Sequence, residues 1–177
     1  MRNRISTVFV ALALVAGLSS PTGWAASIKD ATVSISMGSE LETMDPHTSS
    51  SALSTTIHRY VFDTLMHRPT GSDQLEPWAA KEVINIDPKT IEFRMREGVK
   101  FSNGEDVDAE AVRFSLMRPM QPDFKTVQAR LYRVIDRVEV VSKWVVRVHK
   151  KRADPGLLRR LADWGSLVPP KLYATLS

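Results

Sequence analysis

The sequence contains no cysteine among its 177 residues. Disulfide bonds, thiolate metal sites and cysteine nucleophiles are therefore excluded. It also lacks an apolar run long enough to span a bilayer, which takes roughly 20 residues, because the most apolar stretch covers only residues 8–18. Its composition, 43% apolar and 25% charged residues, is that of an ordinary globular domain, and its length fits one such domain.

A strong excess of one charge is missing as well. The whole sequence has 24 basic and 20 acidic side chains, a net charge of +4. Arg2 and Arg4 lie in the first 25 residues, so residues 26–177 carry 22 basic and 20 acidic side chains, a net charge of +2. Basic clusters at 147–152 and 159–160 have no interleaved aromatic residues, so we interpret them as solvated surface and expect no nucleic-acid partner.

Residues 1–25 have the pattern of a secretory signal peptide. Arg2 and Arg4 precede the apolar run, and the small residues Gly23 and Ala25 precede the expected cleavage site after Ala25. Cleavage after Ala26 remains an alternative. A membrane anchor is disfavoured because the run is too short, and the absence of a twin-arginine pair favours the general secretion route.

Residues 91–117 predict a strand, a turn and a capped helix in succession. Apolar and charged residues alternate at the start, which is typical of a strand with one buried face. The sequence Ser-Asn-Gly at 102–104 predicts a turn, and Asp108 is the predicted N-cap of the helix. The expected buried positions are Ile91, Phe93 and Met95 of the strand and Ala109, Val112 and Leu116 of the helix, with Arg113 and Arg118 off the helix stripe.

The same reading of periodicity and turn residues predicts the remaining elements. We expect a first strand over 31–37, a helix over 57–66 closed by the turn at 69–72, and a helix over 157–161. Residues 83–86 and 91–95 predict one hairpin, and 138–141 and 144–148 predict a second with its turn at Ser142 and Lys143.

The sequence gives little support to enzyme or metal chemistry. Its histidines show no zinc-site spacing, and the nearest approach, Asp63 and His67 on the predicted helix, supplies only two ligands. No Gly-x-Ser-x-Gly elbow, phosphate-binding loop or convincing nucleophile and base pair is present. We therefore expect no catalysis, no metal and no cofactor, and interpret the histidines His47, His58, His67 and His149 as surface or capping residues.

Five passages resemble one known family in the order in which the family has them. The longest is EFRMREGVKFSNGEDVDAEAVRFSLMR at 92–118. The others are LETMDPH at 41–47, VFDTL at 61–65, LEPWAA at 75–80 and LVPPK at 167–171. Residues 32 to the end are similar to the family 5 solute-binding proteins of bacterial ABC importers, which include dipeptide-, oligopeptide- and nickel-binding proteins.

The resemblance implies an α/β fold for residues 26–177, namely the N-terminal lobe of a type II periplasmic binding protein with a mixed sheet, flanking helices and β-hairpins. It implies capture of a peptide-like or other small solute and delivery to an ABC permease complex in the inner membrane. The loop after the Asp-Pro-His motif lines the ligand cleft in the family, which carries over to Ser49, Ser50, Ser51 and Ala52. Solvated turn residues are the alternative interpretation of this loop, and Asp45, Pro46 and His47 are expected to shape it.

The resemblance also implies the location and state of the chain. Without cysteine the N-terminus cannot carry a lipid on that residue, so we expect a freely diffusing periplasmic monomer. Family members are more than twice as long, so the chain is expected to be an incomplete lobe that binds ligand weakly or not at all by itself. A stand-alone periplasmic interaction module derived from one lobe is the alternative, and the choice among peptide, nickel chelate, opine and sugar stays open.

Overall fold

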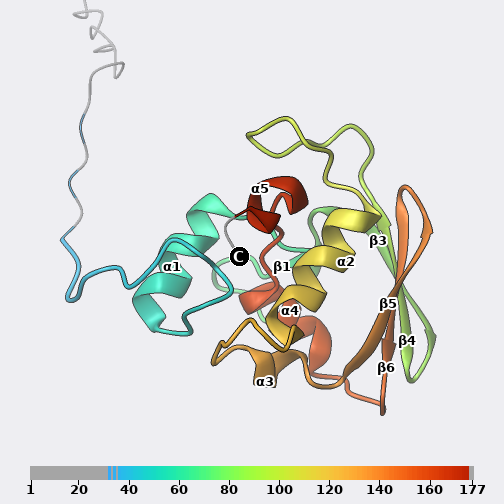
Figure 1. Cartoon of the computed structure of the whole chain (residues 1–177). Helices are drawn as coiled ribbons and strands as arrows, with labels where there is room; N and C mark the ends of the chain where they lie inside the picture. Colours follow the sequence, from blue (N-terminus) through green and yellow to red (C-terminus); the bar gives the residue numbers. More distant parts are fainter. Residues whose placement is uncertain (1–31, 33, 35, 176–177) are drawn as a thin grey trace, which may run out of the picture. The chain divides into compact units, whose positions relative to one another are not determined.

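The computed structural model describes residues 32, 34 and 36–175 (Figure 1). The chain divides into residues 1–36 and 37–177, and the second unit contains every helix and strand described below. The predicted signal peptide over 1–25 lies outside the described residues. So do residues 31, 33 and 35 of the strand predicted over 31–37, and Thr32, Ser34, Ser36 and Met37 belong to no strand.

A four-stranded antiparallel sheet forms one side of this unit (Figure 1). Its strand order is β3 (Ala80–Asp87), β4 (Thr90–Met95), β6 (Val145–Lys150) and β5 (Ile135–Ser142). Both predicted hairpins are confirmed. The turn of the second lies at Lys143 and Trp144, one residue later than predicted, because β5 extends through Ser142, which pairs with Val145.

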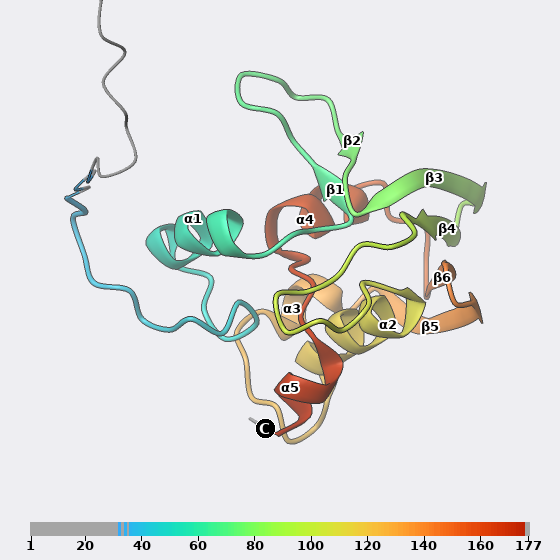
Figure 2. The same cartoon turned by 90° about the horizontal axis from the view of Figure 1, so that it is seen from above.

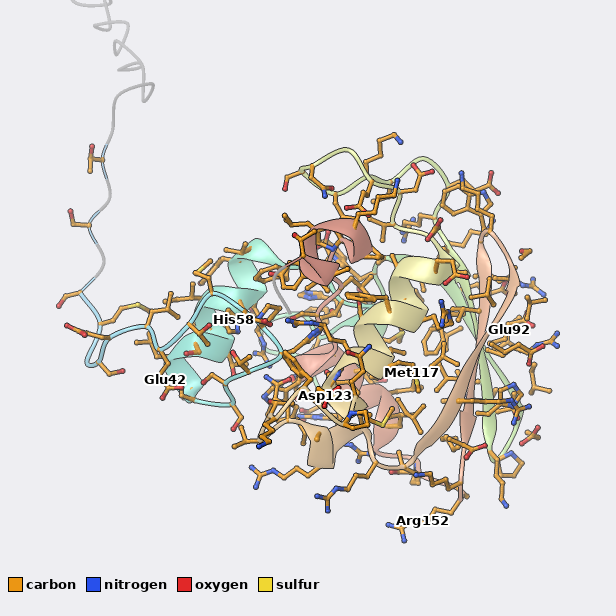
Figure 3. The ribbon with its side chains drawn as sticks, in the orientation of Figure 1. Glu42, His58, Glu92, Met117, Asp123 and Arg152 are labelled. Carbon is orange, nitrogen blue, oxygen red and sulfur yellow. The ribbon has the colours of Figure 1, made fainter. Side chains whose placement is uncertain are left out.

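The two faces of the sheet differ as the alternation of β4 predicts. Ile91, Phe93 and Met95 are buried on the face that α2 (Ala109–Met117) covers. On the opposite face Glu92 accepts hydrogen bonds from Arg94 and Arg147, at 3.2 and 2.9 Å (Figure 3). The apolar side chains of β4, β5, β6 and α2 form the core together with those of other segments, among them Leu65, Leu157 and Leu167, and burying them is the main source of stability.

Helix α2 begins as predicted, with the Asp108 carboxylate accepting the Ala111 N–H at 3.0 Å. The predicted stripe of Ala109, Val112 and Leu116 is fully buried. Arg118, which was predicted to lie off this stripe, begins the short 3₁₀ helix η2 (Arg118–Met120), and its side chain is only 2% exposed. Among the described residues, no helix is long and apolar enough to cross a membrane.

The remaining helices lie on the same side of the sheet as α2 (Figure 2). They are α1 (Ala52–Val61), α3 (Ala129–Tyr132), α4 (Leu157–Trp164) and α5 (Pro170–Ala174), and a small ladder pairs β1 (Met66–His67) with β2 (Glu76–Pro77). Helix α4 contacts β1, and α5 contacts α2. The helix predicted over 157–161 is confirmed as α4 and runs three residues further.

The helix predicted over 57–66 was wrong in its second half. Helix α1 ends at Val61, and Phe62 is already extended. The backbone that follows pairs with distant segments instead: the Leu167 N–H donates to the Asp63 carbonyl at 2.8 Å and the Trp78 N–H to the Leu65 carbonyl at 3.0 Å. Hydrogen bonds to distant segments of the chain thus replace the intrahelical bonds that the apolar spacing alone predicts.

Candidate functional site

An ion pair between Asp45 and Arg118 fixes the start of the predicted ligand loop. Arg118 Nη1 and Nη2 donate to Asp45 Oδ1 and Oδ2 at 2.9 and 2.7 Å. The guanidinium carbon also lies 4.1 Å from the ring centre of Phe124 and 4.9 Å from that of Tyr173. Burial alone would raise the pKa of Asp45, but hydrogen bonds from Arg118 and the His47 amide lower it below its ordinary value, so the pair stays charged.

His47 holds the other end of the Asp-Pro-His motif. Its Nε2 lies 2.9 Å from the Ser166 carbonyl oxygen and its Nδ1 lies 3.3 Å from Arg118 Nη1. A carbonyl only accepts and a guanidinium only donates, so the ring is neutral with its proton on Nε2. Burial lowers the pKa of His47 to about 4, and nearby Arg118 opposes protonation as well. The expectation that His47 is a surface or capping residue was wrong.

Two side chains from residues 126–128 hold the carbonyl groups of the loop. Gln128 Nε2 donates to the Pro46 carbonyl at 2.7 Å and also to the Ser49 carbonyl. Thr126 Oγ1 donates to the His47 carbonyl at 2.5 Å. Gln128 is 1% exposed and its Oε1 has no hydrogen-bond partner among the described residues. The loop is therefore anchored by a segment about 80 residues further along the chain.

Ser49 and Ser51 use their hydroxyl groups within the loop. Ser49 is buried, and its hydroxyl donates to the Glu42 carboxylate and accepts the Ser51 N–H at 3.1 Å. The Ser51 oxygen caps α1 by accepting the Ser54 N–H at 3.3 Å, which is a common role of a hydroxyl residue at a helix start. Two of the four predicted contact residues thus have structural roles.

Ser50 and Ala52 are the more accessible members of the predicted set. Ser50 is half-buried and Ala52 is exposed at the first turn of α1. Within residues 36–175, no hydrogen bond satisfies the N–H, carbonyl or hydroxyl group of Ser50. Ser50 is therefore a loop residue whose N–H, carbonyl and hydroxyl groups are all left for a ligand among the described residues.

The second histidine of this region, His58, is also buried rather than a surface residue. Its Nε2 lies 2.9 Å from the Thr43 carbonyl oxygen and its ring packs edge-on against Phe62. Figure 3 shows His58 on α1, beside the segment that carries Glu42. His58 therefore ties residues 42–44 to α1, just before the ligand loop.

A hollowed surface surrounds Asp63, which the sequence placed on a helix with His67. Instead Asp63 follows α1 in extended backbone and accepts the Trp78 indole N–H at 2.7 Å, and His67 stacks against Trp78 with ring centres 5.1 Å apart. Hollows of about 150, 340 and 170 Å³ adjoin Asp63. Among the described residues, no three histidine, aspartate or glutamate side chains are placed to hold a metal ion.

Arg118, Thr126 and Gln128 are the residues of this site that the sequence did not single out. The helical pattern placed Arg118 only off the buried stripe, and no pattern marked Thr126 or Gln128. Only the resemblance of 92–118 to the family passage drew attention to this part of the chain.

Comparisons with solved structures define the class of fold. The structure superimposes on OppA of Burkholderia pseudomallei with a TM-score of 0.73 and 18% identity, covering 78% of this chain and 30% of that one. It superimposes on NikA of Brucella suis, solved with Fe(III)-EDTA, with a TM-score of 0.64 and 27% identity, covering 74% of this chain and 26% of that one. The chain therefore has the fold of one part of a periplasmic binding protein, as expected.

The family follows from sequence comparison. Residues 74–175, more than half of the chain, match the model of bacterial extracellular solute-binding proteins, family 5 Middle, so the chain belongs to this family. It is 28% identical to the glutathione-binding protein GsiB of Pectobacterium atrosepticum over 153 residues, and 27% identical to GsiB of Escherichia coli K12 over the same length. These matches cover 86% of this chain, which spans 29% of the length of each relative.

Proposed function

We propose that the chain is a periplasmic substrate-binding component of an ABC importer that captures peptide-like solutes and passes them to an inner-membrane permease. The observation that carries this proposal is the loop at 45–51, which is held by buried contacts while the polar groups of Ser50 stay unpaired. A fixed loop that presents free backbone groups loses little entropy when a peptide main chain binds to it.

The relatives narrow the chemistry of the proposed ligand. The matched GsiB proteins are named for glutathione and OppA-type neighbours include a complex with the peptide RPPGFSPFR. Both ligands carry peptide bonds, whose N–H and carbonyl groups match the groups that Ser50 leaves free. We therefore place peptide-like solutes ahead of metal chelates for this chain, with reduced glutathione and trialanine as the first probes.

A titration followed by ¹H–¹⁵N NMR tests this proposal directly. Because the chain spans less than a third of its relatives, we expect weak, saturable binding with a dissociation constant of roughly millimolar size, which corresponds to only about 4 kcal/mol. The shifts should be centred on residues 49–52. Shifts elsewhere but not at this loop would overturn the assignment, and tight stoichiometric binding by calorimetry would contradict the incomplete-lobe interpretation.

The alternative, a periplasmic interaction module, is favoured by one specific observation. Tyr60 at the end of α1 is 86% exposed, and Trp78 beside the hollows around Asp63 is 50% exposed. Exposed aromatic groups of this size are common in protein interfaces. The genomic sequence beyond the codon for Ser177 separates the two functions: coding sequence for a second lobe assigns solute capture to the joined product, and unrelated sequence favours the module.

A further inference from the structure

The contacts of Gln128 go beyond the packing of a buried polar side chain. Its amide nitrogen has two hydrogens, and both are used on carbonyl oxygens three residues apart, those of Pro46 and Ser49. The side chain therefore closes the loop as a bridge between its two ends. Thr126, two residues earlier, occupies the His47 carbonyl between these two acceptors.

These bonds decide which backbone groups of the loop remain available. The Ser49 carbonyl is taken by Gln128, the Ser51 N–H by the Ser49 hydroxyl, and the Ser51 carbonyl by the Thr55 N–H of α1. Ser50 lies between them with its N–H and carbonyl both unpaired in the described part of the chain. One residue with both groups free can exchange two hydrogen bonds with a single residue of an extended peptide.

We infer that Gln128 is a positioning residue that holds the loop so that Ser50 can make a two-bond contact with one peptide unit of the ligand. This inference rests on the proposed function and deepens it. An added strand paired with Ser50 would also use the groups of Thr48 and Ala52, two residues to either side. The Thr48 N–H already donates to the Asp45 carbonyl, and the Ala52 carbonyl accepts the Thr56 hydroxyl. Gln128 itself is buried and does not need to touch the ligand.

Two substitutions remove the bridge in different ways. Gln128→Met keeps the length and neutrality of the side chain but has no N–H group. Gln128→Glu places a carboxylate against two carbonyl oxygens, which repels them when ionised, whereas the protonated acid can donate one hydrogen bond. Burial raises the pKa of a carboxyl group, so Gln128→Glu should regain part of the bridge as the pH falls from 7.5 to 5. Gln121→Glu makes the same chemical change at an exposed residue of the same segment and is the matched control.

Hydrogen exchange of the His47, Thr48 and Ser51 amides, which all donate hydrogen bonds within the loop, tests the positioning role when it is measured by NMR on the ligand-free full chain. At pH 7.5 we expect protection factors in Gln128→Met and Gln128→Glu to fall by roughly tenfold, as for the loss of one to two net hydrogen bonds. At pH 5 protection should return partly in Gln128→Glu and not in Gln128→Met. The other titratable and charged groups that face the loop are Glu42, Asp45, His47 and Arg118. A change of protection with pH that the wild type also shows is therefore assigned to these groups.

The result that overturns the inference is equally specific. Protection factors within twofold of wild type in both variants, with folding confirmed by circular dichroism, would leave Gln128 no positioning role. If Gln128→Glu lost the same protection at pH 5 as at pH 7.5, the loss would come from altered packing rather than from the missing hydrogen bonds. Titrations with trialanine then test the link to ligand binding: the dissociation constant should rise in the variants as protection is lost. If the wild type binds neither probe, the proposed function fails. The exchange data would still decide whether Gln128 positions the loop.

Discussion

Arg118 and Asp45 are separated by 73 residues in the sequence, yet both terminal nitrogens of the guanidinium reach the two carboxylate oxygens, at 2.9 and 2.7 Å. The arginine is also covered by Phe124 and Tyr173. This pair joins the end of α2 to the segment that leads into the loop at 49–52. A bidentate pair of this kind fixes orientation as well as distance.

Replacing Arg118 by methionine should destabilise the fold strongly. The change leaves the Asp45 carboxylate without its cation, and breaking a buried pair costs roughly 3 kcal/mol or more. Urea unfolding followed by circular dichroism measures the loss. The control is Arg113→Met, which removes a solvent-exposed pair with Glu110 and should change the free energy of unfolding by less than about 0.5 kcal/mol. Equal effects of both substitutions would contradict the role given to Arg118.

His47 should make stability depend on pH in the mildly acidic range. Burial lowers its pKa from 6.5 to about 4 in the folded chain. The unfolded chain therefore binds the proton first, so stability is complete above about pH 6.5 and decreases as the pH falls towards 4. The loss should approach roughly 3 kcal/mol, since one pKa unit corresponds to about 1.4 kcal/mol.

The variant His47→Gln isolates this effect. Glutamine can still donate to the Ser166 carbonyl but does not titrate. Urea unfolding between pH 7.5 and 4.5 should therefore show a smaller decrease in the variant than in the wild type. An identical pH dependence in both proteins would show that another group is responsible.

Removing the cap of α1 should have a smaller and local cost. Ser51→Ala deletes the oxygen that accepts the Ser54 N–H, and loss of such a cap costs about 1 kcal/mol. Ser50→Ala is the matched control, because the Ser50 hydroxyl has no partner among the described residues, and its free energy of unfolding should stay within about 0.5 kcal/mol of wild type. A larger loss in Ser50→Ala than in Ser51→Ala would show that the cap is misassigned.

Gly165 should tolerate no side chain. A Cβ at this position would lie 2.4 Å from the Leu161 carbonyl oxygen, whereas one at Gly38 would have no atom within 4 Å. Overpacking of this kind costs roughly 1–3 kcal/mol, so Gly165→Ala should lower the thermal midpoint clearly. Gly38→Ala should leave it nearly unchanged. Because Ser166 follows Gly165 and its carbonyl oxygen accepts the hydrogen bond from His47 Nε2, Gly165→Ala should also broaden the NMR signals of residues 46–51.

The elements that the sequence predicted well are those set by local patterns. The alternation in β4 and the Asp108 cap of α2 each depend on residues close together in the chain, and both were confirmed. The end of α1 was missed because the residues after Val61 pair with residues 77–80 and 166–167, which no local pattern reveals.

The candidate site was predictable only in part for the same reason. The resemblance located the loop at 49–52 and the Asp-Pro-His motif suggested its shape, which the Asp45 to His47 hydrogen bond at 2.9 Å confirms. Whether the four loop residues contact ligand stays a prediction. Arg118 and Gln128 were missed because their burial comes from packing between distant segments, and their residue types alone favour an exposed position.

The anchors of the loop also bear on the order in which the chain folds. Each residue of the motif bonds to a distant partner: Asp45 to Arg118, Pro46 to Gln128, and His47 to Ser166, which lies 119 residues further along the chain. Closing such long loops costs entropy before any contact is gained, so distant pairings form late. Residues 45–51 should therefore be among the last parts of the chain to become ordered, after the hairpins of the sheet. A chain that emerges from the ribosome in N- to C-terminal order can therefore complete the contacts of this loop only after Ser166 has emerged.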